Sequence, residues 1–491
     1  MANPDSSDAQ RDLPAIGPSG WRASRRPGSG RPGREPFGVL IVGGGFSGAA
    51  TAMHLARRAT RPVRIVLFDP APQAGRGVAY GEGPADFLLN VPAGRLTIDP
   101  DRPGDFHHWA VASGRASAPD AFLPRVWFGA YAAERLEQAV AENPLVELVH
   151  ERDAVAGVSV DGGTVRVKTA KGEVFTGDHA VLALGHGPLR VPGALAGLRD
   201  DPRLLFGPWN RDALARLAEK AERILLVGTG LTMVDAVIGL ERAGFRGDLV
   251  AVSRRGTLAR SHGPKDDAAH AAWASDLRGL TVRELTRAIR ERAAAGDWRG
   301  VIDSLRPHTQ GLWQDLDERD RARFLARLAV YWDVHRHRAP PAVHAEVDSL
   351  LSMGRLRIMA GGLESARIVE DRIAVRLRPR HAGETTVYAD GVVLCTGAEP
   401  DPRRWGSGLV DGLLSAGLAD ADALGLGLRT DAHGYLLTPA GASDTRLSTI
   451  GPLRRGDLWE STAVPEIGRQ AADLAQSVLD HAFIRTAAVP A

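Results

Sequence analysis

The chain has 491 residues, 44% of them hydrophobic, which is enough for large buried cores and suggests two to four domains. Its formal net charge is only +2, so the charge balance gives no reason to expect a nucleic-acid partner. No apolar run approaches the roughly 18 residues that a membrane-spanning helix needs, and we therefore expect a cytoplasmic protein with no membrane partner.

The first 36 residues differ in composition from the rest of the chain. They are rich in Pro, Gly, Ser and Arg, end in "RRPGSGRPGREP", and lack the apolar core of a signal peptide. A segment of this kind cannot bury enough apolar surface to fold by itself. We expect residues 1–36 to be a disordered tail.

The stretch "VLIVGGGFSGAA", residues 39–50, is typical of a strand, a tight turn and a helix. Gly43 would allow the turn, Gly45 would let a pyrophosphate approach the backbone, and Gly48 is the third glycine of the pattern. The next strand, "PVRIVLFDP", ends with Asp69, whose carboxylate can accept hydrogen bonds from ribose hydroxyls. The pattern predicts a dinucleotide-binding unit, and the alternative is an ordinary α/β turn that contains glycines.

A second stretch, "ILLVGTGLTMVD", residues 224–235, repeats this pattern. Gly228 and Gly230 occupy the turn, and Thr232 follows at the start of the helix. Met233 stands where the third glycine would be, so we expect this helix to lie slightly farther from its strand.

The strand after the second loop, "GDLVAVSRRG", has no carboxylate at the position where one would accept hydrogen bonds from an adenosine ribose. It has Ser253, Arg254 and Arg255 instead. A hydroxyl and two guanidinium groups can bind a 2′-phosphate that a carboxylate would repel. This site is therefore expected to prefer NADPH to NADH, and the alternative is a solvated basic loop.

The repeat extends beyond the glycine loops. Both halves continue into an alternating hairpin and then an apolar strand, "VRVKTAKGEVFTGDHAVLALGHGP" in the first and "IAVRLRPRHAGETTVYADGVVLCTGAEP" in the second. The sequence predicts an α/β fold with two Rossmann-like domains, the second inserted in the first. This is the architecture of the two-dinucleotide flavoproteins, in which the first domain holds FAD and the second holds NAD(P)H. We expect an FAD domain in residues 37–200 and 391–491 and an NADP domain in residues 201–390.

A long polar, helical segment, residues 264–354, interrupts the second domain. Within it, "DRARFLARLAVYWDVHRHRAPP" predicts one helix that ends before Pro340 and Pro341. One apolar face of this helix would carry Phe324, Leu328, Tyr331 and Trp332.

Four basic residues gather at the end of that helix: His335, Arg336, His337 and Arg338. Cations there can complement the negative end of the helix dipole. The alternative is an anion site for a substrate carboxylate or for the nicotinamide dinucleotide, in which Arg336 and Arg338 would be the anchors.

The single cysteine, Cys395, excludes an internal disulfide and the CxxC dithiol of disulfide-reducing flavoenzymes. Its apolar surroundings, "GVVLCTG", favour a packing role. The fifteen histidines show no metal-ligand spacing, so we expect no metal.

Several motifs together resemble a bacterial family of FAD/NAD(P)-binding proteins. They are "GRGVAYG", "FLLNVPAG", "VGTGLTMVDAV", "VSRRG", "YWDVHRHRAPP" and "GPLRRGDLWESTAVPEIGRQAA". The resemblance extends from about Phe37 to the C-terminal helix. This family is similar to the flavin-dependent N-monooxygenases that oxidise the amine of L-aspartate to nitrosuccinate. The resemblance implies FAD, NADPH and amine oxygenation, and it leaves the substrate open.

The resemblance also implies roles for individual residues. In addition to the glycine loop and Asp69, Arg76 and Asn90 would lie near the flavin ring. The segment "IGPLRRGDLWESTAVPEIGRQAADLAQ" would add Gly451 and Trp459 to the flavin site, and its helix would direct its N-terminus at the flavin. The alternative for this segment is a simple closing helix.

These observations predict an FAD-dependent monooxygenase that consumes NADPH and O2. The reduced flavin would form a C4a-hydroperoxide and transfer its distal oxygen to a small amine that carries a carboxylate. A Baeyer–Villiger enzyme fits less well, because "FGPWNRDAL" lacks the histidine of that family's motif. Two other interpretations stay open: an NADPH-dependent reductase or dehydrogenase without oxygen insertion, and a sensor that binds flavin or NADP without turnover. A homo-oligomer is compatible with the sequence.

Overall fold

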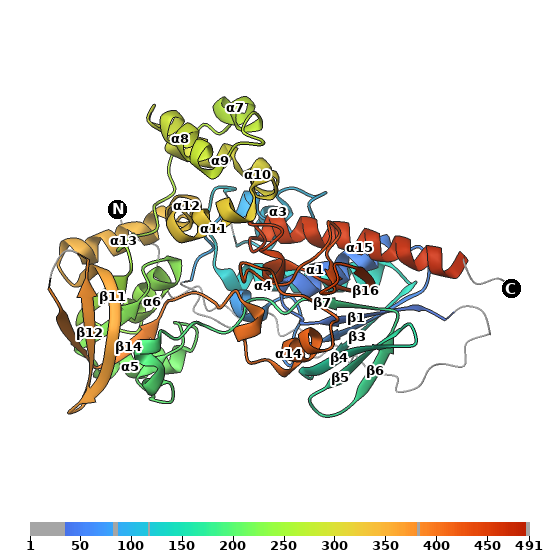
Figure 1. Cartoon of the computed structure of the whole chain (residues 1–491), viewed down its shortest axis with the longest axis horizontal. Helices are drawn as coiled ribbons and strands as arrows, with labels where there is room; N and C mark the ends of the chain where they lie inside the picture. The colour runs from blue at the N-terminus through green and yellow to red at the C-terminus, as the bar shows by residue number, and fades with distance from the viewer. Residues whose placement is uncertain (1–34, 82–86, 116–117, 381–382, 488–491) are drawn as a thin grey trace.

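The computed structural model describes residues 35–81, 87–115, 118–380 and 383–487. The predicted disordered tail, residues 1–36, lies outside these ranges except for its last two residues. The described chain contains two large β-sheets that lie side by side, and a group of helices projects from one side of the molecule (Figure 1).

The first sheet has six strands in the order β15-β16-β7-β1-β2-β3. All neighbouring strands run parallel except β15 and β16. Its central strands are short, buried apolar runs, as expected for a parallel sheet covered on both faces. The strands are β1 (Phe37–Val42), β2 (Val63–Phe68), β3 (Val146–Glu151), β7 (His179–Leu182), β15 (Tyr435–Leu437) and β16 (Ser443–Thr449).

Helices cover one face of the first sheet, and a small antiparallel sheet covers much of the other. The helices are α1 (Phe46–Arg58), α3 (Asp105–Ala112), α4 (Arg125–Glu142) and α15 (Val464–Ala487), which share one core with β1 and β2. The small sheet consists of β4 (Val155–Asp161), β5 (Thr164–Thr169) and β6 (Val174–Gly177), and α14 (Gly408–Ser415) packs beside it.

The second sheet has seven strands in the order β13-β12-β11-β10-β9-β14-β8. Its strands are β8 (Leu204–Leu205), β9 (Arg223–Val227), β10 (Asp248–Ser253), β11 (Leu356–Val369), β12 (Arg372–Pro379), β13 (Thr385–Ala389) and β14 (Gly391–Leu394). Helices α5 (Arg211–Lys220), α6 (Leu231–Arg242) and α13 (Pro341–Ser352) pack into one core against it.

The two sheets repeat one plan, which confirms the predicted pair of Rossmann-like units. The order β2-β1-β7 in the first corresponds to β10-β9-β14 in the second, and the second unit is inserted between β7 and β15. The predicted domain boundary at residue 391 is wrong by one strand. Residues 391–394 form β14, which pairs with β9 and β8 of the second sheet, so the chain returns to the first unit only after β14.

The inserted helices leave and rejoin the second unit at one narrow point. Ser261 pairs with Ala339, and the amide of His262 donates to the carbonyl oxygen of Ala339 at 3.1 Å. We call residues 263–338 the helical insertion. It contains α7 (Ala271–Ser275), α8 (Val282–Ala293), α9 (Trp298–Ser304), α10 (Thr309–Asp315), α11 (Glu318–Arg327) and α12 (Ala329–Arg336).

Two predictions about this segment need correction. The predicted insertion, residues 264–354, is too long, because α13 packs on α6 in the core of the second unit. The single helix predicted before Pro340 is two helices, since the backbone breaks at Leu328, where φ is −114° and ψ is −29°. Among the described helices, none combines the length and the apolar character that crossing a bilayer requires.

Candidate cofactor sites

The first glycine loop joins β1 to α1, and the three glycines of the predicted pattern differ in what the surrounding structure allows at each. Gly43 has φ +103°, and a Cβ there would lie 2.3 Å from the carbonyl oxygen of Ala183. A Cβ on Gly48 would lie 1.9 Å from the carbonyl oxygen of Gly43. A Cβ on Gly45 would meet nothing closer than the Cα of Gly77, at 3.6 Å. The protein itself therefore requires Gly43 and Gly48, whereas the space beside Gly45 is open.

The same loop offers free hydrogen-bond donors. No side chain caps the N-terminus of α1, and its first turn contains no acidic residue. Unpaired backbone N–H groups at a helix start form a binding site for a phosphate. Asp69 lies beside the loop as predicted, because its carboxylate accepts from the amide of Gly44 at 2.7 Å. A carboxylate has about four acceptor positions, so this bond and the one from the amide of Ala71 leave capacity for ribose hydroxyls.

Arg76 also lies at the first loop. The amide of Gly75 donates to the carbonyl oxygen of Gly44 at 2.8 Å, which ties the "GRG" segment to the glycine turn. The Nε atom of Arg76 is buried and has no hydrogen-bond partner among the described residues. A buried guanidinium nitrogen without a partner fits a site that an anionic ligand completes.

The C-terminal segment reaches the same loop through Gly451. This residue follows β16, has φ +80°, and a Cβ there would lie 2.9 Å from Oγ of Ser47 in α1. Its amide donates to Oε1 of Gln470 in α15 at 3.1 Å. The Nε2 atom of Gln470 is buried without a partner among the described residues. Gly451 thus lies beside the first glycine loop, and its role at the flavin stays a prediction; Gln470 adds a donor that no local sequence pattern indicated.

The second glycine loop joins β9 to α6 and repeats the division of roles. Gly228 has φ +120°, and a Cβ there would lie 2.1 Å from the carbonyl oxygen of Cys395. A Cβ on Gly230 would meet no atom within 4 Å. Thr232 lies half-buried in the first turn of α6, and Met233 is fully buried. Cys395 packs in the core as predicted, and burial raises the pKa of its thiol.

The three residues predicted to bind the 2′-phosphate differ in whether their side chains already have hydrogen-bond partners within the protein. Oγ of Ser253 lies 2.8 Å from Oγ1 of Thr229 and accepts from the amide of Gly256 at 3.0 Å. Arg255 donates to the carbonyl oxygen of Ala326 at 3.2 Å, and its guanidinium lies over Tyr331. Arg254 is exposed, and its side chain has no ion pair or hydrogen bond within the described ranges. Arg254 is therefore the residue best placed to bind a phosphate.

This difference gives a prediction for nucleotide preference. Arg254→Ala is expected to weaken NADPH binding by about 10-fold, through loss of a charge-assisted contact, with little change for NADH. Arg255→Ala should affect both nucleotides equally, because it loosens the contact between the second unit and the helical insertion. Titration of each variant with both nucleotides checks this. An equal loss for both nucleotides in Arg254→Ala would contradict the assignment.

The comparison with known proteins agrees with this geometry. Residues 40–187, which contain the first loop, Asp69 and Arg76, match a family model described as FAD-NAD(P)-binding. Residues 40–187 belong to an FAD/NAD(P)-binding domain. No curated protein matches the chain.

Solved structures share the fold over most of the chain. Ornithine hydroxylase from Pseudomonas aeruginosa, in its reduced form, is 16% identical, with a TM-score of 0.61. Ornithine N-hydroxylase from Kutzneria sp. 744, with reduced FAD, NADP+ and L-ornithine, is 14% identical, with a TM-score of 0.63. L-lysine 6-monooxygenase from Pseudomonas syringae is 19% identical, with a TM-score of 0.63. Each comparison covers 91% of this chain and 100% of the other.

Asn90 lies where the FAD/NAD(P)-binding domain meets the base of the helical insertion. Its carbonyl oxygen accepts from Nε2 of His262 at 2.9 Å, and its side-chain amide makes no hydrogen bond among the described residues. The amide is therefore available to a ligand, and its role at the flavin ring stays a prediction. His262 was not anticipated, because nothing in "RSHGP" indicates a partner 172 residues away.

His262 predicts a dependence of stability on pH. Burial lowers its pKa from 6.5 to about 4, so the fold favours the neutral ring. Its contribution to the free energy of unfolding is complete above pH 6.5 and is lost as the pH falls toward 4. His262→Gln, which keeps a donor for Asn90, should lose less stability over this window than the wild type. Urea unfolding at a series of pH values measures the difference, and parallel curves would contradict this role.

Trp459 lies apart from the first glycine loop, and its predicted role at the flavin stays a prediction. Its ring lies 5.0 Å from those of both Trp313 and Phe324, within the core of the helical insertion. It therefore joins the segment after Gly451 to the inserted helices. The contacts of its ring do not place it at the FAD loop.

Arg336 and Arg338 are buried and ion-paired, although Nε of each has no hydrogen-bond partner among the described residues, so their role as substrate anchors stays a prediction. Arg336 lies 3.1 Å from Glu460 and 3.7 Å from Glu466, and Arg338 pairs with Asp303. Both arginines are less than a tenth exposed. They clamp the end of α12 to the segment that leads into α15 and to α9. The dipole of α12 is a smaller influence than these direct pairs.

Proposed function

We propose that this protein is an FAD- and NADPH-dependent monooxygenase that oxygenates the nitrogen of a small amine bearing a carboxylate. The observation that carries the proposal is the pair of glycine loops, each with one glycine whose free side faces no protein atom closer than 3.6 Å. Two such loops provide for two dinucleotides in one chain. The shared fold supports amine oxidation, because the solved structures of this shape are named as ornithine and lysine hydroxylases.

The residues present fit the two cofactors. FAD would be held by the first loop, Asp69 and Arg76, with Gly451 and Gln470 completing the site, and NADPH by the second loop and Arg254. When bound, FAD accepts a hydride from NADPH and activates O2 for transfer to a soft nucleophile. The chain's own part is to orient both dinucleotides and to exclude water from the reacting groups. Within the described ranges, no His, Cys, Asp and Glu side chains gather as a metal site.

The proposed reaction is balanced without another reactant. One atom of O2 joins the amine nitrogen, and the other is released as water. NADPH supplies two electrons, and a proton from solvent completes the water molecule. The products are a hydroxylamine, NADP+ and water.

Isotope transfer tests the proposal directly. The flavin-loaded protein is mixed with NADPH, labelled O2 and a panel of amines that includes L-ornithine, L-lysine and L-aspartate. Mass spectrometry should find one labelled oxygen on the nitrogen of at least one amine. Oxidation of NADPH that yields only hydrogen peroxide with every amine would instead identify a reductase or oxidase. Absence of any NADPH oxidation would leave a binding protein without turnover.

A further inference from the structure

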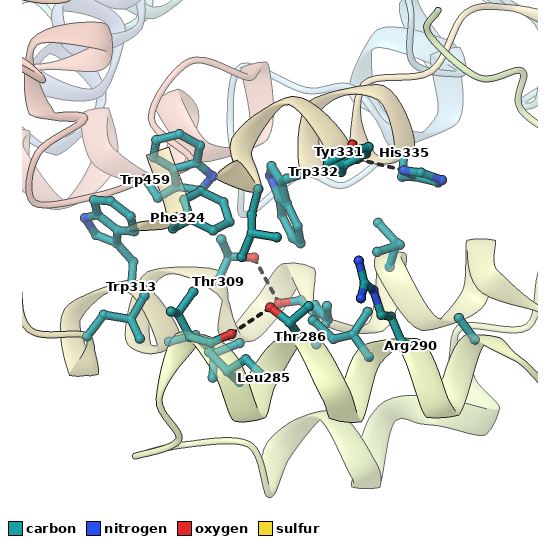
Figure 2. A pocket seen from close by; sticks show the side chains of 18 of the residues that line it. Leu285, Thr286, Arg290, Thr309, Trp313, Phe324, Tyr331, Trp332, His335 and Trp459 are labelled. Atoms are coloured by element: carbon teal, nitrogen blue, oxygen red, sulfur yellow. Dashed lines mark hydrogen bonds between the residues drawn. The ribbon is translucent and has the colours of Figure 1, made fainter. Parts of the chain in front are cut away.

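The helical insertion contains a partly open cavity of about 350 Å³. It lies between α8, α9 and α10 on one side and α11 and α12 on the other (Figure 2). This volume is within the range of sites for small organic ligands.

The wall of the cavity is apolar. The two threonine hydroxyls in it are already used, since Thr286 donates to the carbonyl oxygen of Val282 and Thr309 to that of Leu305. Two of the four indole N–H groups are also used: Trp313 donates to the carbonyl oxygen of Gly456 and Trp332 to the carboxylate of Glu460. The indole N–H groups of Trp298 and Trp459 make no hydrogen bond among the described residues, and the rest of the wall offers a ligand ring faces and methyl groups.

One end of the cavity is an aromatic corner. The rings of Trp313 and Trp459 are inclined by 31°, and that of Phe324 stands at 90° to Trp459 (Figure 2). This arrangement accepts a flat ring or a branched hydrocarbon against ring faces and edges. Trp459 comes eight positions after Gly451, so the corner and the candidate flavin site draw on one segment of the chain between β16 and α15.

The other end carries unpaired positive charge. Arg290 projects from α8 toward α12, on the side where Tyr331 and His335 lie (Figure 2). Its guanidinium is exposed and has no ion pair among the described residues. The ring of His335 packs on Trp298 at 5.0 Å, and its Nδ1 donates to the carbonyl oxygen of Tyr331. A guanidinium beside an apolar cavity is suited to an acidic group on a largely apolar ligand.

We propose that this cavity binds the substrate, and that the substrate is an acid with an aromatic or large branched apolar body. The body fills the space against Trp313 and Trp459, and the acidic group pairs with Arg290. The identification of this ligand as the substrate rests on the proposed function, whereas its binding does not. A long polar side chain such as that of ornithine would leave its charged end in the apolar wall, so such amines are expected to be poor ligands.

A charge series on one ring system tests the chemistry of the site. Calorimetry of the flavin-loaded protein with indole-3-acetate, 3-methylindole and tryptamine compares an anion, a neutral molecule and a cation. We expect affinity to fall in that order. Acetate alone and L-ornithine should bind at least 10-fold more weakly than indole-3-acetate, because they lack the apolar body. Failure of all three indoles to bind at millimolar concentration would overturn the proposal.

Two matched pairs of variants locate the binding. Ala293→Trp fills the cavity from its wall and should lower the affinity for indole-3-acetate by more than about 10-fold. Ala294→Trp, at the exposed neighbouring position, should leave that affinity unchanged. Arg290→Ala should lower the affinity for indole-3-acetate about 3- to 10-fold and leave the affinity for 3-methylindole unchanged. Arg287→Ala, on the solvent side of the same helix, is its control. Unchanged affinity in folded Ala293→Trp would show that the ligand binds elsewhere.

Turnover separates this inference from the proposed function. L-tryptophan and L-phenylalanine should stimulate NADPH oxidation and gain a labelled oxygen, and Ala293→Trp should abolish the stimulation. Oxygenation of L-ornithine alone, insensitive to Ala293→Trp, would overturn the substrate assignment and leave the proposed function standing. Binding of indole-3-acetate without oxygenation of any amine would overturn the proposed function and leave the cavity as an acid-binding site.

Discussion

Replacing Gly45 with valine is expected to give a folded protein without flavin. Gly45 has φ −65° and ψ −168°, an extended conformation that any residue adopts. A Cβ there makes only an ordinary contact, 3.6 Å from Gly77. The fold therefore does not require glycine at this position. A branched side chain would instead occupy the space through which the pyrophosphate approaches the helix N-terminus.

The measurement is flavin absorbance per protein together with the melting temperature. Flavin content should fall by at least about 10-fold, because the phosphate would lose several backbone hydrogen bonds at once. The melting temperature of the flavin-free variant should match that of wild-type protein stripped of flavin. A folded Gly45→Val protein with full flavin content would show that FAD binds elsewhere.

Two further glycines serve as controls. Gly230→Val should keep its flavin and lose at least about 10-fold in NADPH affinity, since Gly230 faces open space at the second loop. Gly48→Ala should instead destabilise the protein, because its Cβ would lie 1.9 Å from the carbonyl oxygen of Gly43. Loss of both cofactors in Gly45→Val and in Gly230→Val would mean that the loops serve only the fold.

The glycine loops and the duplicated plan were predictable because both are local in sequence. Glycine spacing reports backbone conformation over a few residues, and the hairpin with its following strand repeats in the same order in each half. The structure confirms the two sheets and the insertion of the second unit in the first. The boundary at residue 391 was wrong because an apolar strand does not indicate which of two sheets it will join.

The surroundings of the insertion were not predictable for the opposite reason. The basic residues around Arg336 have partners that are distant in sequence: Glu460 lies 124 positions farther along the chain, and Asp303 lies 35 positions before Arg338. Trp459 likewise meets Trp313 across a distance of 146 positions. A charged cluster at a helix end has the same sequence whether it faces solvent, a substrate or buried carboxylates. Only the packing of α12 against the segment after Gly451 decides among them.

Replacing Arg336 with alanine is expected to lower the free energy of unfolding by about 3–5 kcal/mol. Glu460 is 5% exposed, and among the described residues Arg336 is its one cation within ion-pair distance, at 3.1 Å. Without that cation the carboxylate would be buried with the indole N–H of Trp332 as its remaining donor. Glu466 would keep a cationic partner, because Arg306 donates to both of its oxygens, at 2.9 and 3.2 Å.

Urea unfolding of four proteins tests this role of Arg336. Arg327→Ala removes an exposed arginine from α11 and should change stability by no more than about 0.5 kcal/mol. The double variant Arg336→Met with Glu460→Gln should recover most of the loss seen in Arg336→Ala, because it removes the unpaired charge as well as its partner. At a temperature where Arg336→Ala is folded, its KM for the amine should be that of the wild type. A raised KM with unchanged stability would instead restore Arg336 as a substrate anchor, and the acidic group of the substrate would then lie at the end of α12 rather than beside Arg290.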